Sequence, residues 1–264
     1  MAAQRHPRRE ALSSLAVLPF YLRVFTPCTA PMHLFFLPHL RNGETIIPDA
    51  GQVRHIRALR LQEGDEVSLT DGHGHLATGI LEGDRKTLRI VIRSMVTSAP
   101  QVPFLTVIIA PTKNHDRLEW FVEKAVEIGV HRICLAECDN SERPVVRVDR
   151  LQRMAITALQ QSQRYYLPEI ETPRPFIELL EKPWPAAKFI AHCHPESTKP
   201  FLRDVLTRGA DAVIAIGPEG DFSRDEVYRA EQAGWLSVSL GKSRLRTETA
   251  GLTAVHTFEL TNQV

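Results

Sequence analysis

Two glycine-rich turns near the C-terminal end of the chain each follow an apolar segment. Residues 212–216 lead into Gly217-Pro218-Glu219-Gly220, and residues 236–240 lead into Gly241. A helical pattern begins after each turn. In an open α/β sheet, ligands bind beyond the carboxyl ends of the strands, and glycine lets backbone approach a ligand closely. The two turns therefore predict one small-molecule site built from two loops.

Three side chains in these loops have the chemistry to act on a ligand. Glu219 can accept hydrogen bonds from a ligand or from backbone N–H groups. Glu248 lies in the first turn of a helix expected from Thr247 onward, where it would complement the helix dipole, which is a purely structural use. Arg246 stands beside the same positive end, where a cation is disfavoured. We therefore expect Arg246 to have a binding or catalytic role.

Several common nucleotide and hydrolase sites are excluded by spacing. Gly241-Lys242-Ser243 resembles the end of a phosphate-binding loop, but that motif needs glycine at position 236, which is Leu. No G-x-G-x-x-G sequence is present, which disfavours a dinucleotide fold of the usual kind. No G-x-S-x-G sequence is present either, which disfavours an α/β-hydrolase.

The cysteine pattern does not indicate a metal site. Cys134 and Cys138 are separated by three residues, and His192 and His194 are the available imidazoles. Structural zinc sites usually have paired Cys or His on tight turns. We therefore expect no bound metal, and interpret the cysteines as buried, reduced thiols of a cytosolic protein.

Composition and charge limit the class of protein. The chain has 264 residues, 43% of them hydrophobic and 24% charged, with a formal net charge of +1. No apolar run reaches the ~20 residues of a membrane span. Residues 1–31 hold four of the 32 basic residues and one of the 31 acidic ones, which leaves 28 basic and 30 acidic residues in the remainder. Any contact with nucleic acid must therefore depend on a local group of cations.

Residues 1–31 have no clear folded pattern. Basic residues precede an apolar stretch at 11–20, as in a weak signal sequence, but Pro19 and Arg23 interrupt it. We expect an extension outside the fold, of the kind that a mis-set start codon produces, with Met32 opening the functional unit. Secretion is the alternative, and a cytoplasmic location is the expectation.

Residues 32–100 have the pattern of a small β-barrel or sandwich. Short alternating segments separated by Asp-Gly and Gly-Asp turns indicate strands, and one short helix is expected at 51–61. The expected strands are 32–37, 46–47, 66–70, 75–81 and 87–92. Residues 98–103 are expected to be a linker.

From residue 104 onward, strands alternate with helices, which predicts a mostly parallel α/β sheet. Asp116 with Glu119, Asp149 with Gln152, and Ser223 with Glu226 are interpreted as helix starts. Strands are expected at 104–110, 132–136, 187–191, 212–216 and 236–240, with a further helix at 198–207.

The loops carry a resemblance to the SPOUT methyltransferases, and within them to the RsmE family, which methylates N3 of a uridine in 16S ribosomal RNA. The signatures are Ile216 to Gly220 with Phe222-Ser223, and Leu240-Gly241 with Leu245-Arg246-Thr247-Glu248-Thr249-Ala250. Further segments match in order: Leu59-Arg60-Leu61, Gly64-Asp65, Lys113, Arg117 to Trp120, Glu123 to Val130, Ser141-Glu142-Arg143, Gln161-Ser162, Arg164 and Pro168-Glu169-Ile170. Asp221, Arg244 and Gln163 depart from the family pattern.

The resemblance implies a C-terminal trefoil-knot domain at 104–264 and an N-terminal, RNA-binding, PUA-like barrel at 32–100. It implies a homodimer with S-adenosylmethionine in the knot. The expected cofactor residues are His194, Ile216, Gly217, Pro218, Glu219, Gly220, Leu240, Gly241, Leu245, Arg246, Thr247, Glu248, Thr249 and Ala250. Ala250, Leu252, Ala254, Val255 and Phe258 give the last helix an apolar character compatible with a dimer interface.

The expected reaction places specific demands on the chain. N3 of uridine carries a proton at neutral pH, so the site must accept that proton or stabilise the resulting anion. Arg246 and Arg164 are the candidates for stabilising the anion, and Glu248 is interpreted as an organiser of loop and ligand.

Six basic residues are candidate RNA contacts. Arg54, Arg57 and Arg60 are spaced three apart on the expected helix at 51–61, so they can lie along one side and contact phosphate; a solvated helix face is the structural alternative. The matched segments add Lys113, Arg117 and Arg143.

Two other functions stay open: a SPOUT enzyme with another RNA target, such as a ribose 2′-hydroxyl, and a non-catalytic RNA-binding protein associated with the small ribosomal subunit. The glycine loops distinguish these alternatives, because a protein that only binds RNA has no need of them.

Overall fold

The computed structural model describes residues 33–263 except 85–86, 143–144 and 196–197. The expectations for residues 1–31, for Met32 and for Arg143 lie outside these residues. Two sheets organise the described part of the chain. No helix among the described residues has the length and apolar character needed to cross a membrane.

The N-terminal sheet has five strands in the order β1-β3-β4-β5-β2. Only β1 and β3 pair in parallel; the other pairs are antiparallel. A core that includes Phe35, Ile56, Val67, Leu69 and Ile90 fills one side of it. The strands are β1 (Leu34–Phe36), β2 (Thr45–Ile46), β3 (Glu66–Thr70), β4 (His75–Glu82) and β5 (Arg89–Thr97), with helix α1 (Ala50–Ala58) between β2 and β3.

The C-terminal sheet has six parallel strands in the order β11-β9-β10-β6-β7-β8. Its strands are β6 (Leu105–Ile109), β7 (Arg132–Glu137), β8 (Glu169–Pro175), β9 (Ala187–Ala191), β10 (Ala212–Ile216) and β11 (Leu236–Val238). Its helices are α2 (His115–Ile128), α3 (Val148–Ser162), α4 (Phe176–Glu181), α5 (Leu202–Val205), α6 (Arg224–Gln232) and α7 (Thr247–Asn262). The alternating strands and helices predicted from the sequence are confirmed.

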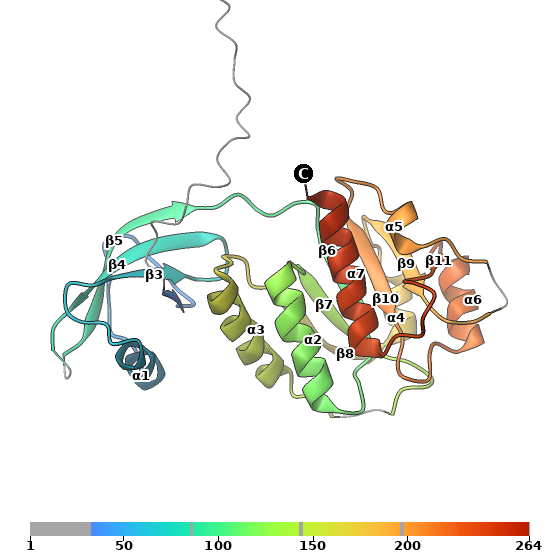
Figure 1. Cartoon of the computed structure of the whole chain (residues 1–264), viewed down its shortest axis with the longest axis horizontal. Coiled ribbons are helices and arrows are strands. Elements are labelled where there is room, and N and C mark those ends of the chain that lie inside the picture. The colour runs from blue at the N-terminus through green and yellow to red at the C-terminus, as the bar shows by residue number, and fades with distance from the viewer. Residues whose placement is uncertain (1–32, 85–86, 143–144, 196–197, 264) are drawn as a thin grey trace, which may run out of the picture. The chain divides into compact units, whose positions relative to one another are not determined.

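Helices cover both faces of this sheet, as Figure 1 shows for α2, α3 and α7 on the near face. Successive residues of one strand pack into different cores, because their side chains point to opposite faces of the sheet. Val107 and Ile109 of β6 pack with the helices α2, α3 and α7, whereas Ile108 packs with α4 and α6. All three side chains are fully buried, which explains why β6 reads as a continuous apolar run.

The last helix returns from the edge of the sheet to its centre. It follows the edge strand β11 but packs on α2, β6 and β10. Ala254, Val255 and Phe258 are buried in the core of their own chain. Of the five residues considered compatible with a dimer interface, these three are therefore already covered by their own chain, whereas Ala250 and Leu252 are only half-buried.

Several expected helix boundaries are corrected by local hydrogen bonds. Helix α2 is capped by the side chain of Asn114, which accepts from the N–H of Asp116, so Asp116 is inside the helix. Helix α3 begins after Arg147 without a side-chain cap. The capping box of Ser223 and Glu226 is confirmed. The helix expected at 198–207 is the short α5, and both β8 and α4 were missed by the pattern analysis.

Helix α1 is shorter than expected, which affects the basic residues on it. It ends at Ala58, and Arg60 lies beyond it with a φ of 59°. Arg54 and Arg57 share the helix, both with exposed side chains. The expected row of three guanidiniums along one helix is therefore reduced to two, because the chain turns before Arg60.

Replacement of Gly251 by alanine in α7 is expected to destabilise the fold. A Cβ there would lie 2.7 Å from the ring of Phe121 and 3.0 Å from Ile109. Alanine gains about 1 kcal/mol of helix propensity over glycine, but overpacking a core costs about 1–3 kcal/mol. We expect a net loss of about 1 kcal/mol in the free energy of unfolding, measured by urea titration.

Thr261→Ala in the same helix is the control for the change in helix propensity that accompanies a substitution by alanine. Its hydroxyl donates to the carbonyl of Thr257, a contact that slightly destabilises helices, so this variant should be neutral or more stable. A Gly251→Ala protein more stable than wild type would show that Phe121 moves aside without cost.

Candidate active site

Three neighbouring parallel strands end at the same level and define the site. Ile216 of β10 is in register with Ala191 of β9, and Ala191 is in register with Val238 of β11. The loops that follow, 192–201, 217–222 and 239–246, therefore leave the sheet at one place. This is the edge at which open parallel sheets bind ligands.

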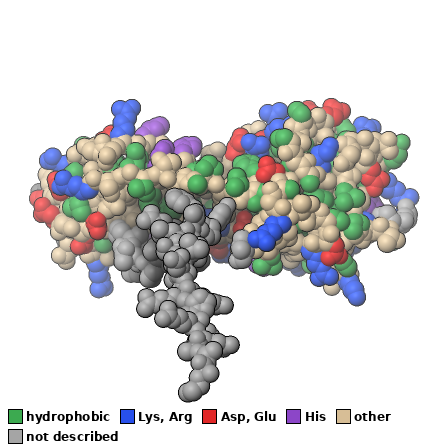
Figure 2. All heavy atoms as spheres, turned by 90° about the horizontal axis from the view of Figure 1, so that it is seen from above, with side chains coloured by type: hydrophobic (Ala, Val, Ile, Leu, Met, Phe, Trp, Pro, Cys, Tyr) green, Lys and Arg blue, Asp and Glu red, His purple; other side chains and the backbone are tan. Residues whose placement is uncertain are grey.

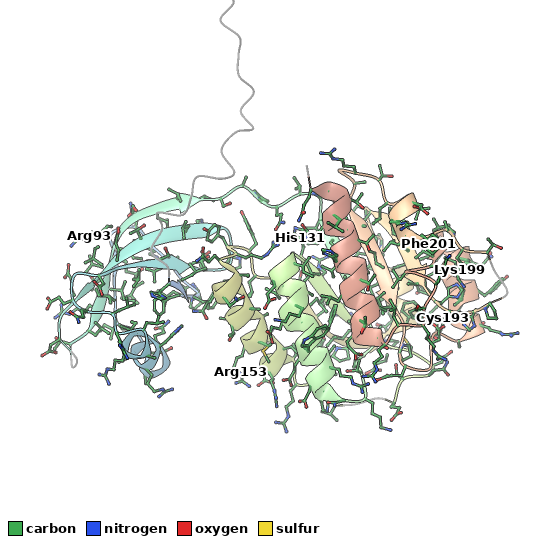
Figure 3. All side chains as sticks on the ribbon, in the orientation of Figure 1. Arg93, His131, Arg153, Cys193, Lys199 and Phe201 are labelled. Atoms are coloured by element: carbon green, nitrogen blue, oxygen red, sulfur yellow. The ribbon has the colours of Figure 1, made fainter. Side chains whose placement is uncertain are left out.

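The loops enclose a cavity of about 890 Å³. Its lining combines apolar side chains, such as Ile216, Leu240 and Leu245, with charged ones. Lys199 and Cys193 lie with Phe201 on the loop that follows β9 (Figure 3). A cavity of this size and mixed lining suits a small organic ligand with a few polar groups.

The loop after β10 is held by its own packing and by α7. The hydroxyl of Thr247 donates to the carbonyl of Gly217 across 3.0 Å. A Cβ on Gly217 would lie 3.0 Å from the ring and the backbone nitrogen of Phe222, and one on Gly220 would lie 3.1 Å from Cβ of Asn140. A side chain at either position would therefore crowd the loop unless Phe222 or Asn140 moved by a few tenths of an ångström.

Asp221 joins the loops that follow β7, β9 and β10. Its carboxylate accepts from the backbone N–H of Cys193 at 2.7 Å and of Phe222 at 2.9 Å. Its own carbonyl accepts from the amide of Asn140 at 3.0 Å. Asp221 has a φ of 66°, a left-handed conformation that Asp and Asn adopt more readily than most residues.

A buried histidine lines the cavity in its neutral form. Nδ1 of His192 accepts from the N–H of His194 and from Nζ of Lys199, so Nε2 carries the proton and donates to Oγ of Ser237 at 3.1 Å. Burial, with the nearby charge of Lys199, lowers the pKa of His192 to about 4. Ser237 in turn donates to Glu231 at 2.7 Å. The network holds the first residues of the loop after β9.

Comparison with known proteins decides the class of the site. Residues 100–259 match the protein-family model described as an RNA methyltransferase domain. The chain belongs to the RNA methyltransferase family. Residues 47–93 match an RNA methyltransferase PUA domain, so the N-terminal sheet belongs to the PUA part of this methyltransferase. The C-terminal parallel sheet has the SPOUT methyltransferase fold expected from the sequence.

Similar proteins come from several bacteria. A probable rRNA-methyltransferase from Porphyromonas gingivalis is 38% identical, covers 86% of this chain and 98% of its own, and superimposes with a TM-score of 0.80. A ribosomal RNA small subunit methyltransferase E from Neisseria gonorrhoeae, bound to S-adenosyl methionine, is 31% identical, with 88% and 98% covered and a TM-score of 0.76. The curated ribosomal RNA small subunit methyltransferase E of Bacillus subtilis is 27% identical over 77% of this chain and 85% of its own.

Most of the cofactor residues expected from the sequence line the cavity of the methyltransferase. These are His194, Ile216, Gly217, Pro218, Glu219, Leu240, Gly241, Leu245, Arg246, Thr247 and Ala250. Gly220, Glu248 and Thr249 do not line it. Glu248 is buried, with Oε1 3.7 Å from Nε of Arg117 and Oε2 without a partner among the described residues.

Arg164, the second candidate for stabilising the uridine anion, does not line the cavity of its own chain. Its guanidinium donates to the carbonyls of Glu127 and Ile128 at the end of α2, and to the side chain of Gln101. Burial lowers the pKa of Arg164, and Glu259 partly offsets this. Its donors satisfy helix-end carbonyls, which is a structural use.

The other basic candidates are placed as follows. Lys113 pairs with Glu142 at 2.9 Å, and this contact raises the pKa of Lys113. Its backbone N–H donates to Glu219 at 3.1 Å. Arg117 faces Glu248, and Arg143 lies outside the described residues. Neither Lys113 nor Arg117 lines the cavity.

Sequence analysis did not assign to the site eight polar or charged residues that line the cavity: His192, Cys193, Lys199, Asp221, Ser239, Lys242, Ser243 and Arg244. Cys193 is exposed, in contrast to the expected burial of the cysteines, whereas Cys134 and Cys138 are buried. Burial raises the pKa of the Cys134 thiol to about 12, so it stays protonated. No cluster of potential metal ligands forms among the described residues.

His192 is expected to make the fold less stable in acid. Its folded pKa of about 4 lies below the usual 6.5, so between these values the unfolded chain binds a proton that the folded chain does not. Stability therefore falls as pH is lowered from about 6.5 to about 4. Between pH 7.5 and 5.0, wild type should lose about 2 kcal/mol more unfolding free energy than His192→Gln, by urea titration. Equal losses would contradict the neutral assignment.

Asp221 is expected to act as a positioning residue through its acceptor oxygens and its backbone conformation. Asp221→Asn keeps an acceptor and the left-handed preference, Asp221→Gly keeps only the conformation, and Asp221→Ala keeps neither. Amide hydrogen exchange at 193–195 should rise in the order Asn, Gly, Ala. A similar rise in all three variants would show that charge, not hydrogen bonding, holds the loop.

Proposed function

We propose that this methyltransferase transfers the methyl group of S-adenosylmethionine to N3 of a uridine in the 16S ribosomal RNA of the small subunit. The cavity where three parallel strands end carries the proposal, in a chain of the RNA methyltransferase family. Relatives named ribosomal RNA small subunit methyltransferase E in several bacteria support the RNA class. The related structure that holds S-adenosyl methionine supports the cofactor.

The residues present suit this cofactor. Ile216, Leu240 and Leu245 offer apolar surface for a purine, and the backbone of 217–219 offers polar groups. The carboxylates of Glu219 and Asp221 lie on the lining, where they complement the positive charge of a sulfonium and an ammonium group. When bound, the cofactor supplies a methyl group already activated on sulfur, so the protein mainly positions the reactants.

The protein's chemical task is to manage the proton on N3. Arg246 is exposed at the edge of the cavity, immediately before α7. A guanidinium there stabilises the uridine anion that forms when the proton leaves. Glu248, in the first turn of the helix, orients the start of α7 through Arg117 of α2. Arg164 has no part in the proposed reaction, because its guanidinium is bound to the end of α2.

We further propose a division of labour along the chain. Residues 32–100 contact RNA through Arg54, Arg57 and Arg60, residues 104–264 perform the transfer, and the enzyme works in the cytoplasm as a homodimer. Trp120 on α2 is 42% exposed, an apolar surface suited to a partner. Sedimentation should give a species of twice 29.8 kDa; an active monomer would contradict the dimer.

The test of the reaction is mass spectrometry of 16S ribosomal RNA. RNA from a strain that lacks the gene should lose one 3-methyluridine, and the purified enzyme with S-adenosylmethionine should restore it on small subunits. A lost ribose methylation instead would favour a different RNA target. Unchanged RNA would favour a protein that only binds.

Arg246→Ala is expected to lower the turnover number about a hundredfold, the usual effect of removing one donor to a developing anion. Arg246→Lys keeps the charge and should lose less. The measurement is methyl transfer under saturating cofactor and RNA. A lower affinity for the cofactor with normal turnover would instead assign Arg246 to cofactor binding.

A further inference from the structure

The loop between β11 and α7 carries three cations on alternate residues. Lys242, Arg244 and Arg246 are all exposed, and all three line the cavity. None of their side chains forms a hydrogen bond or ion pair with the described residues of the chain. Three neighbouring positive charges repel one another, so the folded protein gains nothing from this arrangement by itself.

Other cations near the site have partners, which sets this loop apart. Lys199 contacts the carbonyl of His194 and Nδ1 of His192. Lys113 pairs with Glu142, and Arg117 faces Glu248.

The two acids of the lining are also engaged elsewhere. Glu219 accepts from the N–H of Lys113, and Asp221 accepts from the N–H of Cys193. The positive charge of the loop is thus left for a ligand from outside.

Both ends of the loop are anchored, so the cations project from a fixed base. Oγ of Ser239 donates to the carbonyl of Gly241 at 3.0 Å, and the carbonyl of Ser239 accepts from the N–H of Leu202 at 2.9 Å. At the other end, Thr247 is bonded to Gly217. A preorganised loop loses little entropy when it binds an anion.

Lys242 also borders a second cavity, of about 250 Å³, beside the first. Leu240 and Gly241 line both cavities, so the loop forms the wall between them. The loop therefore presents Lys242 between the two cavities.

We propose that Lys242 and Arg244 bind the backbone phosphates that flank the target nucleotide of the RNA. The proposal rests on the proposed function, because it assumes an RNA substrate. Residues 32–264 carry a slight excess of acid, and acidic and basic side chains are interspersed over the face seen in Figure 2. Attraction from distant charges is screened beyond about 8 Å at physiological salt. Phosphates beside the cavity therefore need cations at its edge.

The test is Lys242→Gln with Arg244→Gln, compared with Arg208→Gln with Arg229→Gln. The control removes the same charge from exposed residues that line neither cavity. Arg246 is left unchanged because it has a separate proposed role. Binding of transcribed 16S ribosomal RNA is measured by fluorescence anisotropy over a range of salt, and binding of S-adenosylmethionine by calorimetry.

The loop variant should bind RNA about tenfold more weakly at physiological salt. Its salt dependence should flatten by about one unit of slope for each lost contact, with cofactor affinity unchanged and the control like wild type. An unchanged slope, or a loop variant no weaker than the control, would overturn the proposal.

A parallel loss of cofactor affinity would also overturn the proposal, because the cations would then bind the cofactor's carboxylate. Failure of the proposed reaction is seen separately, in wild-type enzyme that transfers no methyl group to 16S ribosomal RNA. Equal melting temperatures of the loop variant and wild type would exclude misfolding as the cause of a loss.

Discussion

The register of three parallel strands is the constraint on which the rest of the site depends. Ala191, Ile216 and Val238 lie side by side at the ends of β9, β10 and β11. A shift by one residue would turn each buried side chain to the opposite face of the sheet, and would separate the loops. Because β10 and β9 are apolar on both faces, burial on both sides holds this register against slippage.

Hydrogen bonds between the loops hold them together as one wall of the cavity. Thr247 ties the start of α7 to Gly217, Asp221 ties the loop after β10 to the loop after β9, and Asn140 adds the loop after β7. Each acceptor is a buried or half-buried group that would cost free energy if left unpaired. The loops are therefore ordered by the same bonds that satisfy their backbone.

Charged side chains around the cavity are of two kinds: some hold the loops together, and others have no partner among the described residues. Acids and cations that hold loops together, such as Asp221 and Lys199, have partners within the chain. His192 is kept neutral by burial and by two donors to Nδ1, so it adds no charge to the cavity. Among the described residues, the cations of the cavity lining that have no partner are Lys242, Arg244 and Arg246, which all lie on the loop between β11 and α7.

The sequence by itself determined the strands and much of the cavity. Residues 212–216 and 187–191 were predicted at the observed bounds, because buried parallel strands are short apolar runs with sharp ends. The two glycine turns predicted the position of the cavity, because the loops that bind a ligand follow the carboxyl ends of the strands in an open parallel sheet. Arg246 was singled out because a cation is disfavoured at a helix N-terminus.

Only the tertiary structure decided which polar side chains have hydrogen-bond or ion-pair partners within the described chain and which do not. Arg164 is bound to the end of α2. Val255 and Phe258 are buried in their own chain, because α7 returns to the centre of the sheet, and no local pattern in the sequence signals this return. Asp221 and His192 are held in the cavity wall by contacts with residues far apart in sequence, Cys193 and Ser237. Local patterns report burial and turns, whereas the pairing of one side chain with another depends on the packed fold.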